Sequence, residues 1–392
     1  MSTTDVTVWA QRLAGRDPEQ SHRASTPLEL FFDLTFVVAI AAAAANLHHG
    51  LSEGHWGDLG SYVVVFFGIW WAWMGFTWFS SAYDTDDVLW RVLTLVIMAG
   101  VLVLAAGVPR AFTVGDYRVL ILGYVIMRVP MIAQWLRAAH GHPECRRTGQ
   151  IYGYGIGVLQ IGWLLWAFAF GQAGGVAVLL LLIVGELLVP PLAEREGATP
   201  WHPEHMVERY GLMTIIVLGE VLLSTTGAFS AALQEGTVGR PLVLAALGGL
   251  LVVFCLWWFY FKHTDAEGLA HATRRDLFVW GYGHYVAYAA IAAVGVGLGV
   301  CIDVIEHVAH VSSRAAALTL GAPVAAYLVV IAIIQSLTAG SWRAIGRAVV
   351  TATAVLAVCL AGWEMGLTVL LVGLVLVAAL AFYLADRSSP GA

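Results

Sequence analysis

Charged residues are scarce in this sequence of 392 residues. Asp, Glu, Lys and Arg together make up 12% of it, about half the share found in an ordinary soluble domain. Apolar residues reach 59%, and the mean hydropathy is +0.79. So few charges cannot cover so much apolar surface in water. The composition therefore excludes a soluble enzyme and a disordered protein, and it predicts a polytopic membrane protein whose solvent is the lipid bilayer.

Further absences narrow the kinds of partner and site. The net charge of −6 comes without a basic patch, so no nucleic acid partner is expected. The four cysteines form no spaced cluster, which leaves a disulfide framework and a zinc site without support. The sequence contains no Walker motif, so ATP as a direct energy source is unsupported. The polar residues 1–25 lack the apolar core of a cleavable signal peptide, so we expect the first membrane helix to direct insertion.

Apolar segments of about 20 residues, the length of a membrane-spanning helix, recur along the whole chain. We predict an all-α polytopic membrane protein with about twelve transmembrane helices. They are expected at 28–48, 59–80, 88–107, 117–138, 150–171, 173–191, 206–230, 241–262, 276–302, 314–336, 344–361 and 364–385.

The distribution of basic residues tests this count. With twelve crossings, fifteen Arg and Lys residues fall on the side of the two termini and four on the other, while Arg128 lies inside the fourth helix. Cytoplasmic loops carry an excess of Arg and Lys. Both termini are therefore predicted to be cytoplasmic.

A shift of 179 residues aligns polar residues of the two halves. The matches are Glu29 with Glu208, Thr35 with Thr214, Trp78 with Trp257, and Thr85-Asp86 with Thr264-Asp265. Six helices per copy would give both copies the same orientation, as in several transporter folds with parallel repeats; shared apolar composition is the alternative explanation. The predicted domains are a polar segment 1–25, a first six-helix repeat 26–191, a linker 192–205, a second repeat 206–386 and a tail 387–392.

One predicted polar site lies within the membrane, where an uncompensated charge is costly. Glu220 lies twelve residues beyond Glu208, a rise of about 18 Å along the seventh predicted helix. Arg128 in the fourth helix and His284 in the ninth are the buried groups best able to compensate Glu220. The three residues either bind a proton or cation, or they form a structural ion pair that fixes helix packing.

A second cluster is predicted at the cytoplasmic end of the first and seventh helices. Glu29 and Asp33 are one turn apart and share a face, so they would repel unless a cation, an arginine or a proton intervenes. Alternatively, they contact the positive end of the helix dipole. The seventh helix opens with His205, Glu208 and Arg209. Together with His202, the histidine and glutamate either form an interfacial hydrogen-bond cluster or bind a divalent metal.

Acidic residues also gather where the second predicted helix ends. Asp84, Asp86 and Asp87 lie within four residues, and Asp265 follows the eighth helix at the matching position of the repeat. Such carboxylates are candidates for holding Mg²⁺, or a diphosphate through Mg²⁺, and DxDD also occurs as a proton donor in some terpene cyclases. The alternative is an N-cap for the third helix. No cofactor is firmly implied.

Longer motifs connect several of these positions. They are residues 28–34 (LELFFDL), residues 83–87 (YDTDD), His205 with residues 208–220 (ERYGLMTIIVLGE), Arg128, and residues 280–284 (WGYGH). Together they resemble the bacterial low temperature requirement protein A family, over about residues 20–385. In that family Phe is common where this chain has Tyr210. The resemblance implies a multi-pass protein of the bacterial cytoplasmic membrane, and it supplies no reaction because the family's molecular activity is poorly defined.

These features favour transport or permeation of a small solute, proton or cation over an enzymatic activity. In that interpretation Glu220 is the coupling site, and Glu29, Asp33 and Glu208 gate its cytoplasmic end. One alternative is an intramembrane enzyme that acts on a lipid or polyprenyl substrate at the acidic residues 84–87. Another is a membrane stress-adaptation protein without turnover.

Overall fold

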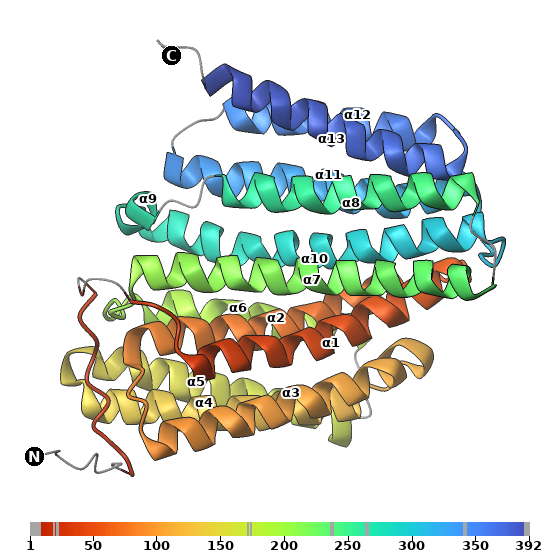
Figure 1. The fold of residues 1–392 in the computed structure, drawn as a ribbon. Coiled ribbons are helices and arrows are strands. Elements are labelled where there is room, and N and C mark those ends of the chain that lie inside the picture. Colours follow the sequence, from red (N-terminus) through yellow and green to blue (C-terminus); the bar gives the residue numbers. More distant parts are fainter. Residues whose placement is uncertain are drawn as a thin grey trace, which may run out of the picture. The chain divides into compact units, whose positions relative to one another are not determined.

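The fold is that of a computed structural model, which describes residues 9–18, 20, 23–170, 172, 175–235, 239–262, 266–339 and 343–387. Within these residues the chain is helical (Figure 1). The helices are α1 (Pro27–Ser52), α2 (Asp58–Tyr83), α3 (Val88–Val114), α4 (Arg118–Gly141), η1 (Pro143–Cys145), α5 (Arg146–Leu164), η2 (Leu165–Ala169), α6 (Gly175–Ala193), α7 (Pro203–Glu235), α8 (Arg240–Phe261), α9 (Ala266–Ala270), α10 (Arg274–Ile305), α11 (Ser313–Ala339), α12 (Arg343–Leu360) and α13 (Met365–Arg387).

The all-α polytopic fold class is confirmed. Each of the twelve predicted spans falls on a long helix, with the fifth span continuing from α5 into η2, and the two short helices η1 and α9 were not expected. Eleven helices among the described residues are long and apolar enough to cross a membrane. The twelfth long helix, α7, is not among these eleven and carries Glu204, Glu208, Arg209 and Glu220. The π-helical turn η2 extends α5, as such turns often do inside longer helices.

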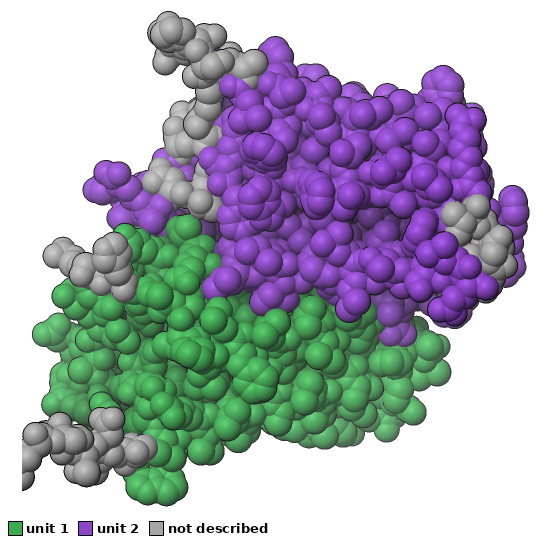
Figure 2. Space-filling view, in the orientation of Figure 1, with its two compact units in different colours: residues 1–42, 68–209 green, residues 43–67, 210–392 purple. Residues whose placement is uncertain are grey.

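The described helices belong to two compact units, drawn in different colours in Figure 2. Unit 1 contains residues 1–42 and 68–209, and unit 2 contains residues 43–67 and 210–392. The division passes through α1, α2 and α7, so each of these helices contributes to both units. It does not follow the predicted boundary at the linker 192–205, and the predicted repeat remains a prediction.

In unit 1, α3, α4, α5 and α6 pack against one another in chain order. Glycines let α3 and α4 approach to backbone contact. A Cβ atom on Gly107 would overlap the backbone nitrogen of Leu120, and one on Gly123 would overlap that of Leu104. Small residues of this kind favour helix association in membranes because van der Waals packing replaces the hydrophobic effect there.

In unit 2, α10 packs on α11, α11 on α12, α12 on α13, and α13 on α8. Glycines again mark the closest approaches. Gly248 of α8 lies against the backbone of Val369 in α13, and Gly366 lies against that of Pro241. Gly297 of α10 leaves no room for a Cβ beside Leu320 of α11. These contacts fix the helix pairs on which the buried polar residues are placed.

Candidate functional site

The densest buried ion-pair network of the described residues lies in unit 1. We call it the Arg209 cluster, and it consists of Glu29, Asp33, His205 and Arg209. The two carboxylates lie one turn apart on α1, and the two basic residues lie one turn apart on α7. All four side chains are at most 1% exposed. The predicted cytoplasmic-end cluster is therefore brought together, with an arginine between the two carboxylates.

Arg209 binds Asp33 in a bidentate manner. Its Nε donates to Asp33 Oδ2 at 2.9 Å and its Nη2 to Oδ1 at 2.6 Å, the strongest geometry for such a pair. The indole Nε1 of Trp73 donates to the same Oδ1 at 2.7 Å. Thr77 and Ser80, which follow Trp73 along one face of α2, accept further hydrogen bonds from Arg209 at 3.5 and 3.3 Å.

Glu29 has two roles. It accepts the backbone N–H of Thr26 at 2.9 Å, while Thr26 Oγ1 accepts the N–H of Glu29 at 3.2 Å, so the two form a capping box at the start of α1. Its Oε1 also lies 2.9 Å from Arg209 Nη1, and His205 Nε2 is 3.2 Å away. Both interpretations predicted for Glu29 therefore apply: it contacts the N-terminus of α1, and an arginine compensates its charge.

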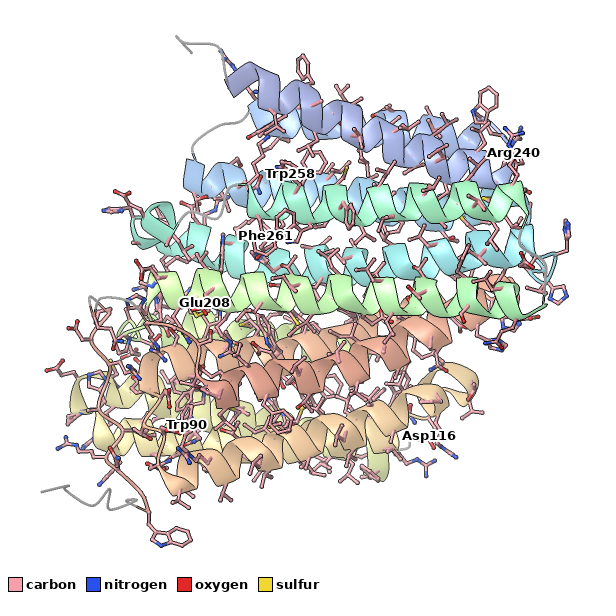
Figure 3. The ribbon with its side chains drawn as sticks, in the orientation of Figure 1. Trp90, Asp116, Glu208, Arg240, Trp258 and Phe261 are labelled. Atoms are coloured by element: carbon pink, nitrogen blue, oxygen red, sulfur yellow. The ribbon has the colours of Figure 1, made fainter. Side chains whose placement is uncertain are left out.

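One added proton would make the Arg209 cluster electrically neutral. Glu29, Asp33 and Arg209 sum to −1 when all three are ionised, and His205 is the remaining member, whose imidazole can be neutral or protonated. His205 Nδ1 is buried without a hydrogen-bond partner in the described residues. At the edge, Glu208 accepts the N–H of Ser25 at 3.2 Å, and its position near the start of α7 is visible in Figure 3.

Arg23 adds a positive charge at the same edge. Its guanidinium donates to the carbonyl oxygens of Ser80, at 2.7 Å, and of Ser81, which terminate α2. Burial lowers the pKa of Arg23 to about 10, so it remains a cation at neutral pH. Arg23 and Glu208 balance each other, and the net charge of the site still depends on His205.

A second buried ion pair was not anticipated. Arg128 Nη2 lies 3.0 Å from Glu186 Oε2, and both side chains are buried. Four more groups donate to the Glu186 carboxylate: Trp71 Nε1 at 2.9 Å, the Tyr124 hydroxyl at 2.9 Å, Gln160 Nε2 at 3.0 Å and Trp163 Nε1 at 3.3 Å. The partner expected for Arg128 was Glu220. The sequence signal that selected Glu220 was a single acidic residue in an apolar segment, and the same signal also selects Glu186.

The predicted contact between His284 and Glu220 is not formed. His284 Nε2 lies 3.1 Å from the Tyr260 hydroxyl, and Nδ1 lies 2.7 Å from the carbonyl oxygen of Trp280. The imidazole packs edge-on against Tyr210, which lies ten residues, or about 15 Å, from Glu220 along α7. Both His284 nitrogens are therefore occupied within unit 2.

Glu220 lies in the α7 part of unit 2. Its side chain is buried, and Oε2 has no hydrogen-bond partner among the described residues. An ionised carboxylate in that environment would be strongly disfavoured. Glu220 thus differs from Glu29, Asp33 and Glu186, each of which faces an arginine.

The acidic residues after α2 act as helix-terminal groups. Asp87 Oδ1 accepts the N–H of Trp90 at 2.7 Å, which confirms the predicted N-cap of α3 (Trp90 is labelled in Figure 3). Asp87 Oδ2 lies 2.9 Å from Arg137 Nη2. Although burial opposes it, hydrogen bonds from the amides of Gln11 and Trp90 lower the pKa of Asp87.

Asp84 and Asp86 occupy different environments. Asp86 is exposed and forms an ion pair with Arg91 at 2.7 Å. Asp84 is buried, and this burial raises its pKa to about 6. Asp265 lies outside the described residues. In the described part of the chain, no group of three His, Cys, Asp or Glu side chains is placed to hold a metal ion.

Two compact units of long apolar helices, with ion pairs buried inside unit 1, define a multi-pass membrane protein. The family model of the bacterial low temperature requirement A protein matches residues 24–384. The chain belongs to this family. It is also 29% identical over 299 residues to a Rhizobium meliloti protein described as uncharacterized, and this match covers 70% of the present chain and 68% of that relative.

Proposed function

We propose that this protein transports a small solute or ion across the cytoplasmic membrane, with proton exchange at the Arg209 cluster. The observation that carries the proposal is that Glu29 and Asp33 share one arginine while His205 faces Glu29 at 3.2 Å. A proton taken up by His205 changes the net charge of this site from −1 to zero. A buried site whose charge can be switched in this way suits ion-coupled transport.

The Arg209 cluster can respond to such a change because its bonds are shared. Glu29 contacts His205, Arg209 and the N-terminal amide of Thr26 simultaneously. A protonated His205 attracts the Glu29 carboxylate more strongly, which weakens its hold on Arg209. Arg209 would then pair mainly with Asp33, so protonation of His205 would redistribute the contacts between α1 and α7.

The predicted parallel repeat is a further support for transport. The offset of 179 residues places α3 on α10, and continuing in chain order, with a longer offset, pairs α4, α5 and α6 with α11, α12 and α13. In each unit these four helices pack against their neighbours in the same order. Parallel repeats of this kind underlie several transporter folds. In this proposal Glu220, buried in α7 of unit 2, is a second protonatable group on the same pathway.

Flux in proteoliposomes tests the proposed transport. The vesicles would enclose a pH-sensitive dye that reports proton movement. Small amino acids, polyamines, monocarboxylates and alkali cations would be added outside them, one class at a time. We expect one of these classes to drive proton movement through the wild-type protein. The rate of this proton flux should fall at least about tenfold in His205→Gln, because a proton-transfer group has been removed. The exposed His140 provides the matched control, His140→Gln. Absence of solute-driven proton flux in the wild type, or equal rates in His205→Gln, would overturn the proposal.

We also infer that both termini face the cytoplasm. The excess of Arg and Lys on their side of the predicted spans supports this orientation. Single cysteines introduced at Arg146 and Arg274 should be protected from a membrane-impermeant thiol reagent in intact cells, while a cysteine at Arg110 should react. Labelling of Arg146→Cys and Arg110→Cys from the same side would contradict the orientation.

A further inference from the structure

A groove in unit 1 lies where α4 ends and α5 begins (Figure 1). Its volume is about 720 Å³, within the range of small-molecule sites. Most of its lining comes from the last turns of α4 and the start of α5, and residues 11–13 of the N-terminal segment complete it. The lining includes the arginines Arg12, Arg137 and Arg146 and, among the described residues, no Asp or Glu.

The N-terminal segment is held against α4 by several contacts. A Cβ atom on Gly141 would overlap the backbone oxygen of Leu13, so the two backbones touch. Arg137 Nη2 donates to the carbonyl oxygen of Gln11 at 3.2 Å, and the N–H of Gln11 donates to Asp87 Oδ2 at 2.8 Å. This part of the groove is therefore fixed to α4 and to the start of α3.

Two positive charges of this groove are not compensated by any described residue. Arg137 is paired with Asp87 at 2.9 Å, so it adds no net charge. Arg12 is exposed, and its Nε donates to the carbonyl oxygen of Gly141 at 2.6 Å, a neutral partner. Arg146, the first residue of α5, is also exposed, and its side chain forms no ion pair within the described part of the chain. The positive end of the α5 dipole adds to this charge, so the groove favours an anionic ligand.

The groove also extends along an apolar part of α4. Ala133 and Leu136 line it, the first exposed and the second half-buried. Ala133 lies eight residues before Gly141, about 12 Å along the helix. Because α4 is long and apolar enough to cross a membrane, the groove runs from the charged end of this helix toward its membrane-spanning part. A ligand that fills this groove would need an anionic group at one end and a hydrocarbon chain at the other.

We propose that this groove binds the phosphate headgroup of an anionic membrane phospholipid. Arg12 and Arg146 would contact the phosphate, since guanidinium groups form strong bidentate contacts with it, and an acyl chain would run past Leu136 and Ala133. Basic sites between helices on the cytoplasmic side attract anionic headgroups. The amine of a zwitterionic headgroup cancels the phosphate charge and would leave the two arginines uncompensated. Lipid binding here does not depend on transport, and the proposed orientation of the termini assigns the groove to the cytoplasmic leaflet.

Lipid binding can be measured on the full-length protein in detergent by native mass spectrometry. The probes are phosphatidylglycerol and phosphatidylcholine with identical acyl chains, and soluble sn-glycerol 3-phosphate. We expect the wild type to bind phosphatidylglycerol more tightly than the other two probes. The double variant R12Q/R146Q should weaken phosphatidylglycerol binding by about 30-fold, because two interfacial cations are removed, and R146Q alone by about fivefold. Phosphatidylcholine binding should not change. Thermal stability in phosphatidylcholine serves as the folding check, and R146Q keeps the test valid if loss of Arg12 disturbs folding.

The matched control removes two exposed arginines whose charges are already compensated. Arg91 is paired with Asp86 at 2.7 Å and Arg147 with Glu196 at 3.1 Å, and both lie on the same predicted side of the membrane as the groove. R91Q/R147Q should retain the preference for phosphatidylglycerol. Equal loss in both double variants, or an unchanged preference in R12Q/R146Q, would overturn the proposal. So would binding of sn-glycerol 3-phosphate as tight as that of phosphatidylglycerol, since the ligand would then be a soluble phosphate compound.

Discussion

The two units handle buried charge in different ways. Unit 1 places Asp33 and Glu186 each against an arginine, at 2.6 and 3.0 Å, and surrounds both carboxylates with indole or hydroxyl donors. Unit 2 buries Glu220 without a partner for Oε2 among its described residues, and its buried His284 contacts only neutral groups, Tyr260 and the Trp280 carbonyl. Among the described residues, unit 1 therefore compensates its buried carboxylates with arginines. Unit 2 leaves Glu220 Oε2 without a partner, which favours the neutral form of this side chain.

The largest effect is expected from removal of Arg209. Arg209→Met would leave Glu29 and Asp33 buried without their shared cation, and loss of one partner of a buried pair costs about 3–5 kcal/mol. Thermal stability in detergent should fall sharply. The triple variant R209M/E29Q/D33N should recover much of the loss. A single variant as stable as the wild type would mean that unit 1 does not depend on this pair.

Loss of Arg128 should be less severe. Arg128→Met would leave the Glu186 carboxylate with its four other donors, so we expect about 2–3 kcal/mol, below the range for an isolated buried ion. A fluorescence-based unfolding assay on R128M, E186Q and the double variant would give the coupling energy. A cost for R128M that exceeds that for R209M would reverse the predicted order of the two pairs.

A smaller effect concerns Asp84. Its pKa in the folded protein is raised to about 6 by burial, above the usual value of about 3.9, so the folded state holds this proton more tightly than the unfolded state does. The corresponding stability is present at low pH and is lost as pH rises from about 4 to about 6, by at most about 3 kcal/mol. Asp84→Asn should remove this component. An identical pH dependence of unfolding in D84N and wild type would contradict the assignment.

The smallest effect on stability is expected from Glu220→Gln. A neutral carboxyl group without an ion partner can be replaced by an amide at a cost of about 1 kcal/mol or less. Proton-coupled flux should nevertheless disappear if Glu220 is on the transport pathway. A stability loss similar to that of R209M would show that Glu220 is ionised and paired, and the contrast between the two units would fail.

Hydropathy predicted the helices because a bilayer demands long apolar segments, and all twelve expected spans fall on helices. The common face of Glu29 and Asp33 followed from their spacing of four residues. The partner of Arg128 could not be derived in that way. Apart from Glu186, α6 is apolar along most of its length. One acidic residue marks a buried face, but it does not reveal which neighbouring helix supplies the partner, so the pairing of Arg128 with Glu186 had to come from the structure.

The separation of Asp33 and Arg209 along the chain has a consequence for biosynthesis. The two residues are 176 positions apart, so at about 5–20 residues per second the ribosome needs about 10–35 seconds to make the second after the first. During that interval α1 carries two acids without their arginine. We expect α1 to remain at the membrane surface or in contact with the insertion machinery until α7 is complete. The amino-terminal helix would therefore be among the last to reach its final packed position.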